Sequence, residues 1–125
     1  MLSNSEIYAV LAASDIGRAR EFYKDKLGLE PAEVRGDGLI YEGKGGAKIL
    51  LYESQFAGTA QNTALSWVTN DLDGEMADLR SRGVEFEDYD LPGLKTENGV
   101  ATYEEGRGAW FKDSEGNILS VTQMN

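Results

Sequence analysis

The chain contains no cysteine and no histidine among its 125 residues. The absence of cysteine excludes disulfide bonds and thiolate metal sites. The absence of histidine removes the most common metal ligand and the most common general base, and with them any Ser-His-Asp triad. Catalysis by this chain would therefore depend on carboxylates, tyrosine, lysine or backbone groups.

Long hydrophobic runs are also absent, and positive charge is scarce. No segment approaches the length of a membrane span, and residues 1–6 do not place a basic region before an apolar stretch. The formal net charge of -10 argues against nucleic acid and anionic membranes as partners. We therefore expect a cytoplasmic protein whose acidic balance serves solubility or favours a cationic ligand.

The composition is that of one globular domain spanning residues 1–125. Hydrophobic residues make up 41% of the chain and charged residues 27%, which is ordinary for a protein with a buried core. Fifteen glycines imply many turns, as in a fold rich in strands.

The first half of the sequence alternates strand-like and helix-like patterns. An apolar run at 7–13 predicts a buried strand. Ser14 and Asp15 can cap a helix, an apolar stripe follows over 16–27, and Gly28 suits the end of that helix. Three further strands are predicted in this half, at 29–34, 39–42 and 47–53.

The same order repeats in the second half, with an offset of about 56 residues. A strand at 63–69 leads to a cap at Asp71, a helical stripe and Gly83. Further strands are predicted at 84–89, 109–112 and 118–123. Residues 90–108 are predicted to be irregular, with at most a short strand near 100–103, and could form a lid, an interface or a plain loop.

Each half thus has the order β-α-β-β-β. The pattern predicts an α+β fold of two βαβββ modules, at about 5–55 and 61–125, that form an open curved sheet or barrel with helices on the outer face. A cleft between two such halves is a natural place for a ligand.

Two stretches of the sequence carry a resemblance to a known family. The first has the pattern SD..RA..FY...LG and comprises Ser14-Asp15-Ile16, Ala19, Glu21-Phe22-Tyr23 and Leu27-Gly28-Leu29. The second, at 109–119, is similar to a closing hairpin FxDPDGNxxEL, with Ser114 in place of the proline. With these motifs the chain resembles the glyoxalase/bleomycin-resistance/dioxygenase (vicinal-oxygen-chelate) superfamily over nearly its whole length. Capping, packing and turn residues indicate fold better than chemistry.

The resemblance implies where a metal ion would bind. Metal-dependent members take His or Gln from the first strand of each half and Glu or His from the last. The matching positions here are Tyr8, Leu50, Ala64 and Ser120. Leu and Ala are not ligands, and neutral Tyr and Ser are poor ones. A register error of one residue adds only the hydroxyl of Thr63, so we expect no metal, no other cofactor and no metal-dependent catalysis.

A carboxylate site elsewhere is the alternative to this interpretation. It would use residues such as Glu53, Glu104 and Glu105, although the last two are more typical of a solvated loop pair. No catalytic residue is identified by the sequence.

Alternation along the strands places a set of side chains on one face of each sheet. The candidate ligand-binding residues are Tyr8, Val10, Lys48, Leu50, Tyr52, Ala64, Ser66, Trp110 and Ser120. They would line an apolar cavity with a few hydroxyls and one ammonium, which suits a partly aromatic small molecule. The alternative is that they pack a closed core. Trp67 falls on the opposite strand face and is expected to pack against a helix.

Three functions remain open at this point. The first is a metal-free small-molecule-binding protein resembling the bleomycin-resistance branch, whose members sequester a cationic drug in clefts of a homodimer. The second is a glyoxalase-like or dioxygenase-like enzyme, a lyase or oxidoreductase with an atypical or absent metal site. The third is a dimeric accessory or regulatory domain.

Overall fold

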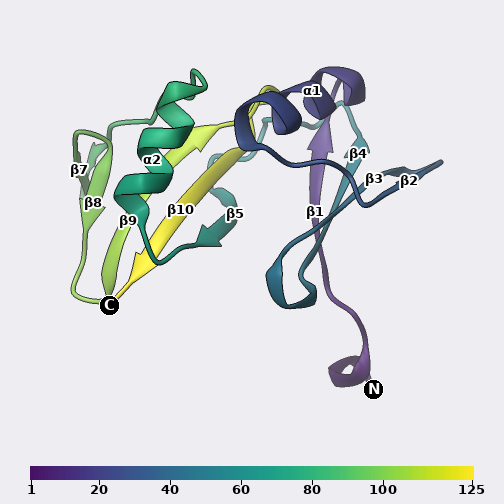
Figure 1. Ribbon diagram of the computed structural model, residues 1–125, viewed down its shortest axis with the longest axis horizontal. Coiled ribbons are helices and arrows are strands. Elements are labelled where there is room, and N and C mark those ends of the chain that lie inside the picture. Colours follow the sequence, from purple (N-terminus) through teal and green to yellow (C-terminus); the bar gives the residue numbers. More distant parts are fainter.

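The computed structural model describes residues 1–125 and consists of two helices and two mixed sheets that do not close into a barrel (Figure 1). The elements of the first half are β1 (Tyr8–Ala13), α1 (Ile16–Leu27), β2 (Glu33–Arg35), β3 (Gly38–Glu42) and β4 (Lys48–Glu53). Their sheet has the order β1-β4-β3-β2, in which β1 and β4 are parallel and the other pairs antiparallel. Short 3-10 turns lie at Leu2–Asn4 and Lys44–Gly46.

The second half repeats this plan with additional strands. Its elements are β5 (Thr63–Val68), α2 (Leu72–Ser81), β6 (Asp90–Leu91), β7 (Leu94–Glu97), β8 (Val100–Thr102), β9 (Gly106–Lys112) and β10 (Ile118–Met124). The sheet order is β5-β10-β9-β8-β7-β6, and β5 is parallel to β10 as β1 is to β4. The α+β architecture of two open halves, predicted from the sequence, is confirmed.

The predicted helix caps are present in both halves. Asp15 accepts a hydrogen bond from the backbone N–H of Arg18, and Asp71 accepts one from Gly74, so each aspartate satisfies a free donor of the first turn. Gly28 ends α1 in the left-handed conformation, with φ of 70°. These caps fix where each helix leaves its preceding strand.

The strand predicted at 84–89 is wrong in its extent. Only Phe86 forms a bridge there, with Phe111, and the backbone N–H of Glu87 donates to Trp110. Beyond this point the Asp88 side chain accepts hydrogen bonds from Thr96 of β7 and from the backbone of Gly99, which replace a continued pairing with β9. The segment predicted as irregular contains the short strand considered near 100–103, as β8, and in addition β6, β7 and the start of β9. The strand predicted at 29–34 shrinks to β2.

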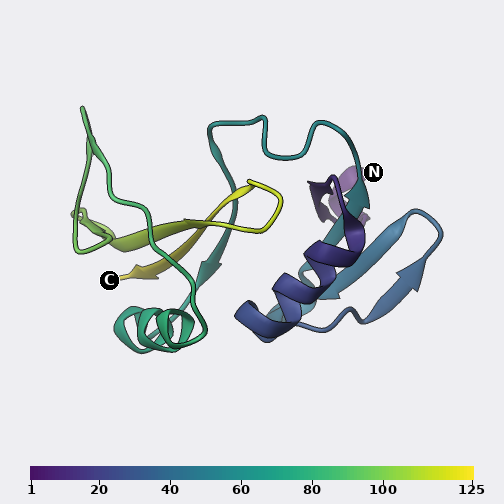
Figure 2. The same cartoon turned by 90° about the horizontal axis from the view of Figure 1, so that it is seen from above.

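One hydrophobic core joins the two halves. It contains sixteen buried residues, drawn from α1 and the first sheet and from α2 and the second. In Figure 2, α1 lies on the side of its sheet that faces the second half. Leu27 and Leu29, at the end of α1, line a common cavity with Trp67 and Phe111 of the second half. α1 is therefore placed between its own sheet and the second half.

Neither helix is long and apolar enough to cross a lipid bilayer.

Candidate functional site

The candidate residues of the first half lie on the face of the first sheet that is turned away from α1, which we call the first helix-free face. Tyr8 and Lys48 are neighbours across the parallel pair β1 and β4, as are Val10 and Leu50. Tyr52 lies further along β4. The alternate residues of the same strands, such as Leu11 and Leu51, pack in the core. The strand alternation expected from the sequence is confirmed here.

This face combines exposed apolar side chains with a lysine that already forms an ion pair. Val10 is 56% exposed and Tyr52 38% exposed. The Lys48 ammonium lies 3.2 Å from the carboxylate of Glu6 and 5.6 Å from the centre of the Tyr8 ring. Glu6 raises the pKa of Lys48, so the ammonium stays protonated. The carboxylate of Glu6 balances this positive charge, and the pair leaves no net charge on the face.

Three of the remaining candidates lie on the second helix-free face, on the side of the second sheet away from α2, whereas Ala64 is the unpaired residue at a register shift between β5 and β10. Ser66, Ser120 and Trp110 stand side by side on three neighbouring strands, β5, β10 and β9. The Ser66 hydroxyl is 2.8 Å from that of Thr122, while Ser120 is buried. The face therefore presents a row of hydroxyls beside an indole.

Trp110 is held in place by two contacts on this face. Its Nε1–H donates a 3.0 Å hydrogen bond to Thr63 Oγ1, and the Tyr89 ring meets its ring edge-on at 6.0 Å between centroids. The pairing of β5 with β10 shifts register between Ile118 and Leu119, beside Ala64. A fixed aromatic ring with partly open surface is a suitable platform for a planar ligand.

Within a single chain the two helix-free faces meet only at one groove along β1, β4 and β5, and most of each face lies outside it. α1 packs on the other face of the first sheet and lies between that sheet and the second half. The first helix-free face is therefore turned away from the second sheet. Of the nine candidates, Lys48 and Ser66 line a common groove of about 760 Å³, together with core-side residues such as Ile49 and Trp67. The others are distributed over the two faces.

The family's metal-ligand positions do not fit a divalent cation in this chain. Tyr8, Leu50, Ala64 and Ser120 supply two neutral hydroxyls, and no group of three or more carboxylates comes together anywhere in the structure. The carboxylates of Glu53, Glu104 and Glu105 therefore do not form an alternative ligand set. Coordination of a divalent ion needs several N or O donors around one point, which these residues do not provide.

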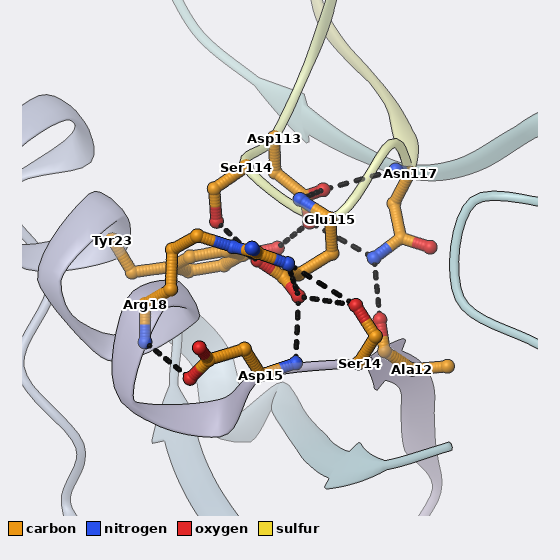
Figure 3. Close-up of polar contacts among 9 residues, drawn as sticks. All are labelled: Ala12, Ser14, Asp15, Arg18, Tyr23, Asp113, Ser114, Glu115 and Asn117. Carbon is orange, nitrogen blue, oxygen red and sulfur yellow. Dashed lines mark hydrogen bonds and ion pairs between the residues drawn. The ribbon is translucent and has the colours of Figure 1, made fainter. Parts of the chain in front are cut away.

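The turn between β9 and β10 carries a buried carboxylate that contacts the start of α1 (Figure 3). Glu115 accepts hydrogen bonds from Arg18 at 2.8 and 2.9 Å, from the backbone N–H of Asp15 at 2.9 Å, and from the hydroxyls of Ser14 and Ser114. Its side chain is fully buried. The Arg18 guanidinium, against the opposing effect of burial, lowers the pKa of Glu115 to about 2.

A second buried carboxylate in the same turn extends this network. Asp113 accepts a 2.8 Å hydrogen bond from the hydroxyl of Tyr23 and three more from the backbone of Glu115 and from Asn117. Asn117 in turn donates to the carbonyl of Ala12 at 2.8 Å. Burial, reinforced by the Asp113 charge, raises the pKa of Tyr23 far above its usual range, so this hydroxyl remains a donor.

These contacts explain the two family motifs in physical terms. In the first motif, Arg18 donates hydrogen bonds to Glu115 of the second motif, and Tyr23 donates one to Asp113. These bonds join the second half to α1. We call this network the hinge clamp: Ser14, Asp15, Arg18, Tyr23, Asp113, Ser114, Glu115 and Asn117. The sequence marked most of these residues as motif positions, but their partners lie about a hundred residues away, and no local pattern reveals the pairing.

The comparisons with known proteins agree with this architecture. The model of the Glyoxalase/Bleomycin resistance protein/Dioxygenase superfamily matches residues 7–121. The chain therefore belongs to this superfamily, in which we expected it from its two motifs. A search of curated proteins gives no match.

Several solved structures share the fold of this chain. A glyoxalase/bleomycin resistance protein from Catenulispora acidiphila is 22% identical, with a TM-score of 0.72 over 96% of this chain and 98% of that one. Another from Streptomyces sp. CB03234 is 25% identical, with a TM-score of 0.69 over 95% and 100%. TnmS3, an antibiotic binding protein from the same Streptomyces strain, is 23% identical, with a TM-score of 0.69 over 98% of both chains.

Proposed function

We propose that this protein is a metal-free binder of a small, partly aromatic, cationic molecule, resembling the bleomycin-resistance branch and acting as a homodimer in the cytoplasm. The observation that carries the proposal is the identity of the residues at the family's metal-ligand positions. Tyr8, Leu50, Ala64 and Ser120 cannot hold a divalent ion, yet their faces keep polar and aromatic groups suited to an organic ligand.

The chemistry of the two faces supports an aromatic cation as the ligand. Trp110 offers an anchored ring, and Ser66 and Thr122 offer hydroxyls next to it. On the first face, Tyr8 and Tyr52 add aromatic surface, and Lys48 is neutralised by Glu6. The net charge of -10 attracts a cation over longer distances. Aromatic surface of this kind also stabilises cations directly.

The orientation of the faces supports a homodimer. Because the two helix-free faces of one chain meet only at the groove of Lys48 and Ser66, a cavity lined by most residues of both needs the first face of one copy opposite the second face of another. Val10 and Tyr52 on the first face, and Val68 at the end of β5, are exposed apolar side chains that such an arrangement would cover.

The name of TnmS3 describes antibiotic binding by that protein, and the shared fold makes ligand binding a reasonable role here.

A thermal unfolding experiment tests the proposal. The protein, in EDTA and separately with Zn²⁺ or Mn²⁺, is mixed with matched tricyclic compounds, 9-aminoacridine as the cation and acridine-9-carboxylate as the anion. The cation is expected to raise the melting temperature equally with and without metal, because a ligand at 100 times its Kd adds about 2.7 kcal/mol to the free energy of unfolding. The carboxylate is expected to have little effect.

Two aromatic variants locate the binding site. Trp110→Phe is expected to weaken 9-aminoacridine binding at least about tenfold, a loss of about 1.4 kcal/mol, whereas Phe56→Leu, which changes an exposed aromatic ring between the two halves, leaves it unchanged. Stabilisation that requires metal, equal stabilisation by the carboxylate, or a monomer in the bound state would contradict the proposal.

A further inference from the structure

A second cavity lies on the opposite side of the second sheet from Trp110, where the end of α1 meets α2 and β5. Its floor consists of Phe111, Val121 and Leu79, all buried in the core. Its walls are Trp67 from β5 and Leu27 and Leu29 from the end of α1. We call it the junction cavity, because its walls come from both halves of the chain.

The junction cavity has the dimensions of a ligand site. Its volume is about 270 Å³, and an apolar protein cavity of roughly 150 Å³ already binds benzene. The Trp67 ring stacks on the floor residue Phe111, with 6.4 Å between centroids and 14° between planes. The cavity therefore has room for a two-ring aromatic molecule against an ordered aromatic wall.

The rim of the cavity determines the charge that a ligand should carry. Glu75 of α2 is the one charged residue in the lining, and Thr69 adds a hydroxyl. The neighbouring acids of α2 are paired, Asp73 with Arg107 at 3.2 Å and Asp78 with Arg82 at 3.4 Å, whereas Glu75 makes no ion pair. An ammonium group at the rim would give this carboxylate a partner that the chain does not supply.

We propose that the junction cavity binds a small aromatic amine, with the ring system against Trp67 and the ammonium at Glu75. This site is separate from the helix-free faces and does not depend on the function proposed for them. Because Leu27 and Leu29 belong to the first half and Glu75 to the second, the occupied site also strengthens the contact between the halves. A bound amine should therefore raise the melting temperature of the whole chain.

Nuclear magnetic resonance of the two indole N–H groups tests the proposal directly. The protein has two tryptophans, Trp67 in the junction cavity and Trp110 on the second helix-free face, and Trp67→Phe and Trp110→Phe assign their signals. Three probes share one ring system and differ in charge: tryptamine, 3-methylindole and indole-3-propionate. Tryptamine is expected to shift the Trp67 signal saturably and to leave that of Trp110 in place, with 3-methylindole weaker and indole-3-propionate weakest.

Two variants separate the role of charge from that of shape. Glu75→Gln is expected to weaken tryptamine about fivefold, in keeping with a partly exposed ion pair, without changing 3-methylindole. The matched control Glu85→Gln removes an exposed, unpaired carboxylate outside the cavity and should change neither. Leu29→Phe narrows the cavity and should weaken the binding of both tryptamine and 3-methylindole.

The outcomes distinguish this site from the function proposed above. No Trp67 shift at millimolar tryptamine, equal affinity for the three probes, or an unchanged affinity in Glu75→Gln would overturn the junction site. A shift of the Trp110 signal alone would overturn it too, while supporting the helix-free faces as the ligand site. A Trp67 shift combined with no 9-aminoacridine binding would uphold the junction site and contradict the function proposed for the faces.

Discussion

Arg18 and Glu115 lie 97 residues apart in the chain, yet they form an ion pair with two hydrogen bonds, Nε to Oε2 at 2.8 Å and Nη2 to Oε1 at 2.9 Å. The guanidinium belongs to the first turn of α1 and the carboxylate to the turn between β9 and β10. The carboxylate is fully buried, whereas 53% of the Arg18 side chain remains exposed. This pair is the central contact of the hinge clamp, and it joins the two halves of the protein.

Glu115→Gln is expected to lower the free energy of unfolding by about 2 kcal/mol at pH 7. The full pKa shift of Glu115 would correspond to more, but the exposed part of Arg18 can turn to water and recover much of the lost interaction. Urea unfolding measures the difference. Asp37→Asn, which breaks the exposed pair with Arg35, serves as the control and should have little effect.

The stabilisation from Glu115 should depend on pH in a defined window. Its pKa falls from an ordinary 4.5 in the unfolded chain to about 2 in the fold, so its contribution is complete above pH 4.5 and is lost as the pH falls towards 2. The stability difference between the wild type and Glu115→Gln should therefore be constant from pH 5 to 7 and narrow below about pH 4.5. A difference that persists undiminished at pH 3 would show that the carboxylate charge is not responsible.

Tyr23 and Tyr41 provide a matched pair of buried hydroxyls. Their rings are 5.4 Å apart, but the Tyr23 hydroxyl donates to Asp113, whereas that of Tyr41 has no hydrogen-bond partner. Tyr23→Phe should cost about 2 kcal/mol, because it removes a hydrogen bond to a charged group. Tyr41→Phe should be neutral or stabilise by up to about 1 kcal/mol, since it removes a buried polar atom without a partner. Equal losses in both variants, measured by urea unfolding, would contradict this account of the clamp.

Gly58, in the segment that links the two halves, lies against the turn that carries Glu115. Its φ is 74°, and a Cβ atom at this position would lie 2.5 Å from the backbone carbonyl oxygen of Glu115. Gly58→Ala is therefore expected to cost more than about 2 kcal/mol, from backbone strain together with the collision.

Gly45 is the control for Gly58. Its φ is 78°, but a Cβ there would meet nothing within 4 Å, so Gly45→Ala should cost only about 1 kcal/mol of strain. Thermal unfolding of the two variants compares them under the same conditions. A loss of stability in Gly58→Ala no larger than that in Gly45→Ala would mean that a side chain at position 58 does not collide with the backbone of Glu115.

Much of the fold could be predicted from local sequence signals. Asp15 and Gly28 mark the ends of α1, Asp71 marks the start of α2, and the alternation along β1 and β4 separates core residues from the first helix-free face. These features are readable because caps, left-handed glycines and strand alternation depend on neighbours a few residues away. The repeat of the two halves follows from the same signals.

The sequence-based prediction is wrong where contacts with distant residues or with side chains determine the backbone conformation. Residues 84–89 alternate like a strand, but Asp88 instead accepts hydrogen bonds from the Thr96 hydroxyl and the Gly99 backbone. The same network orders a hairpin within 90–108, a segment whose glycines favoured an irregular loop. For the candidate site, alternation identified which residues share a face, except at Ala64, where a register shift in β5 brings Thr63 to the Trp110 side instead. The relative orientation of the two faces depends on the hinge clamp, which links residues about a hundred positions apart and has no local signature.

Metal binding tests the central claim most directly. The protein is dialysed to equilibrium against Zn²⁺, Mn²⁺, Ni²⁺ and Fe²⁺ in turn, and the metal retained per chain is measured alongside 9-aminoacridine binding to the same samples. We expect far less than one equivalent of each metal, with ligand affinity the same in every sample and in EDTA. One equivalent of a tightly held ion, lost on mutation of Tyr8 or Ser120 and needed for ligand binding, would contradict the claim that this superfamily member binds its ligand without metal.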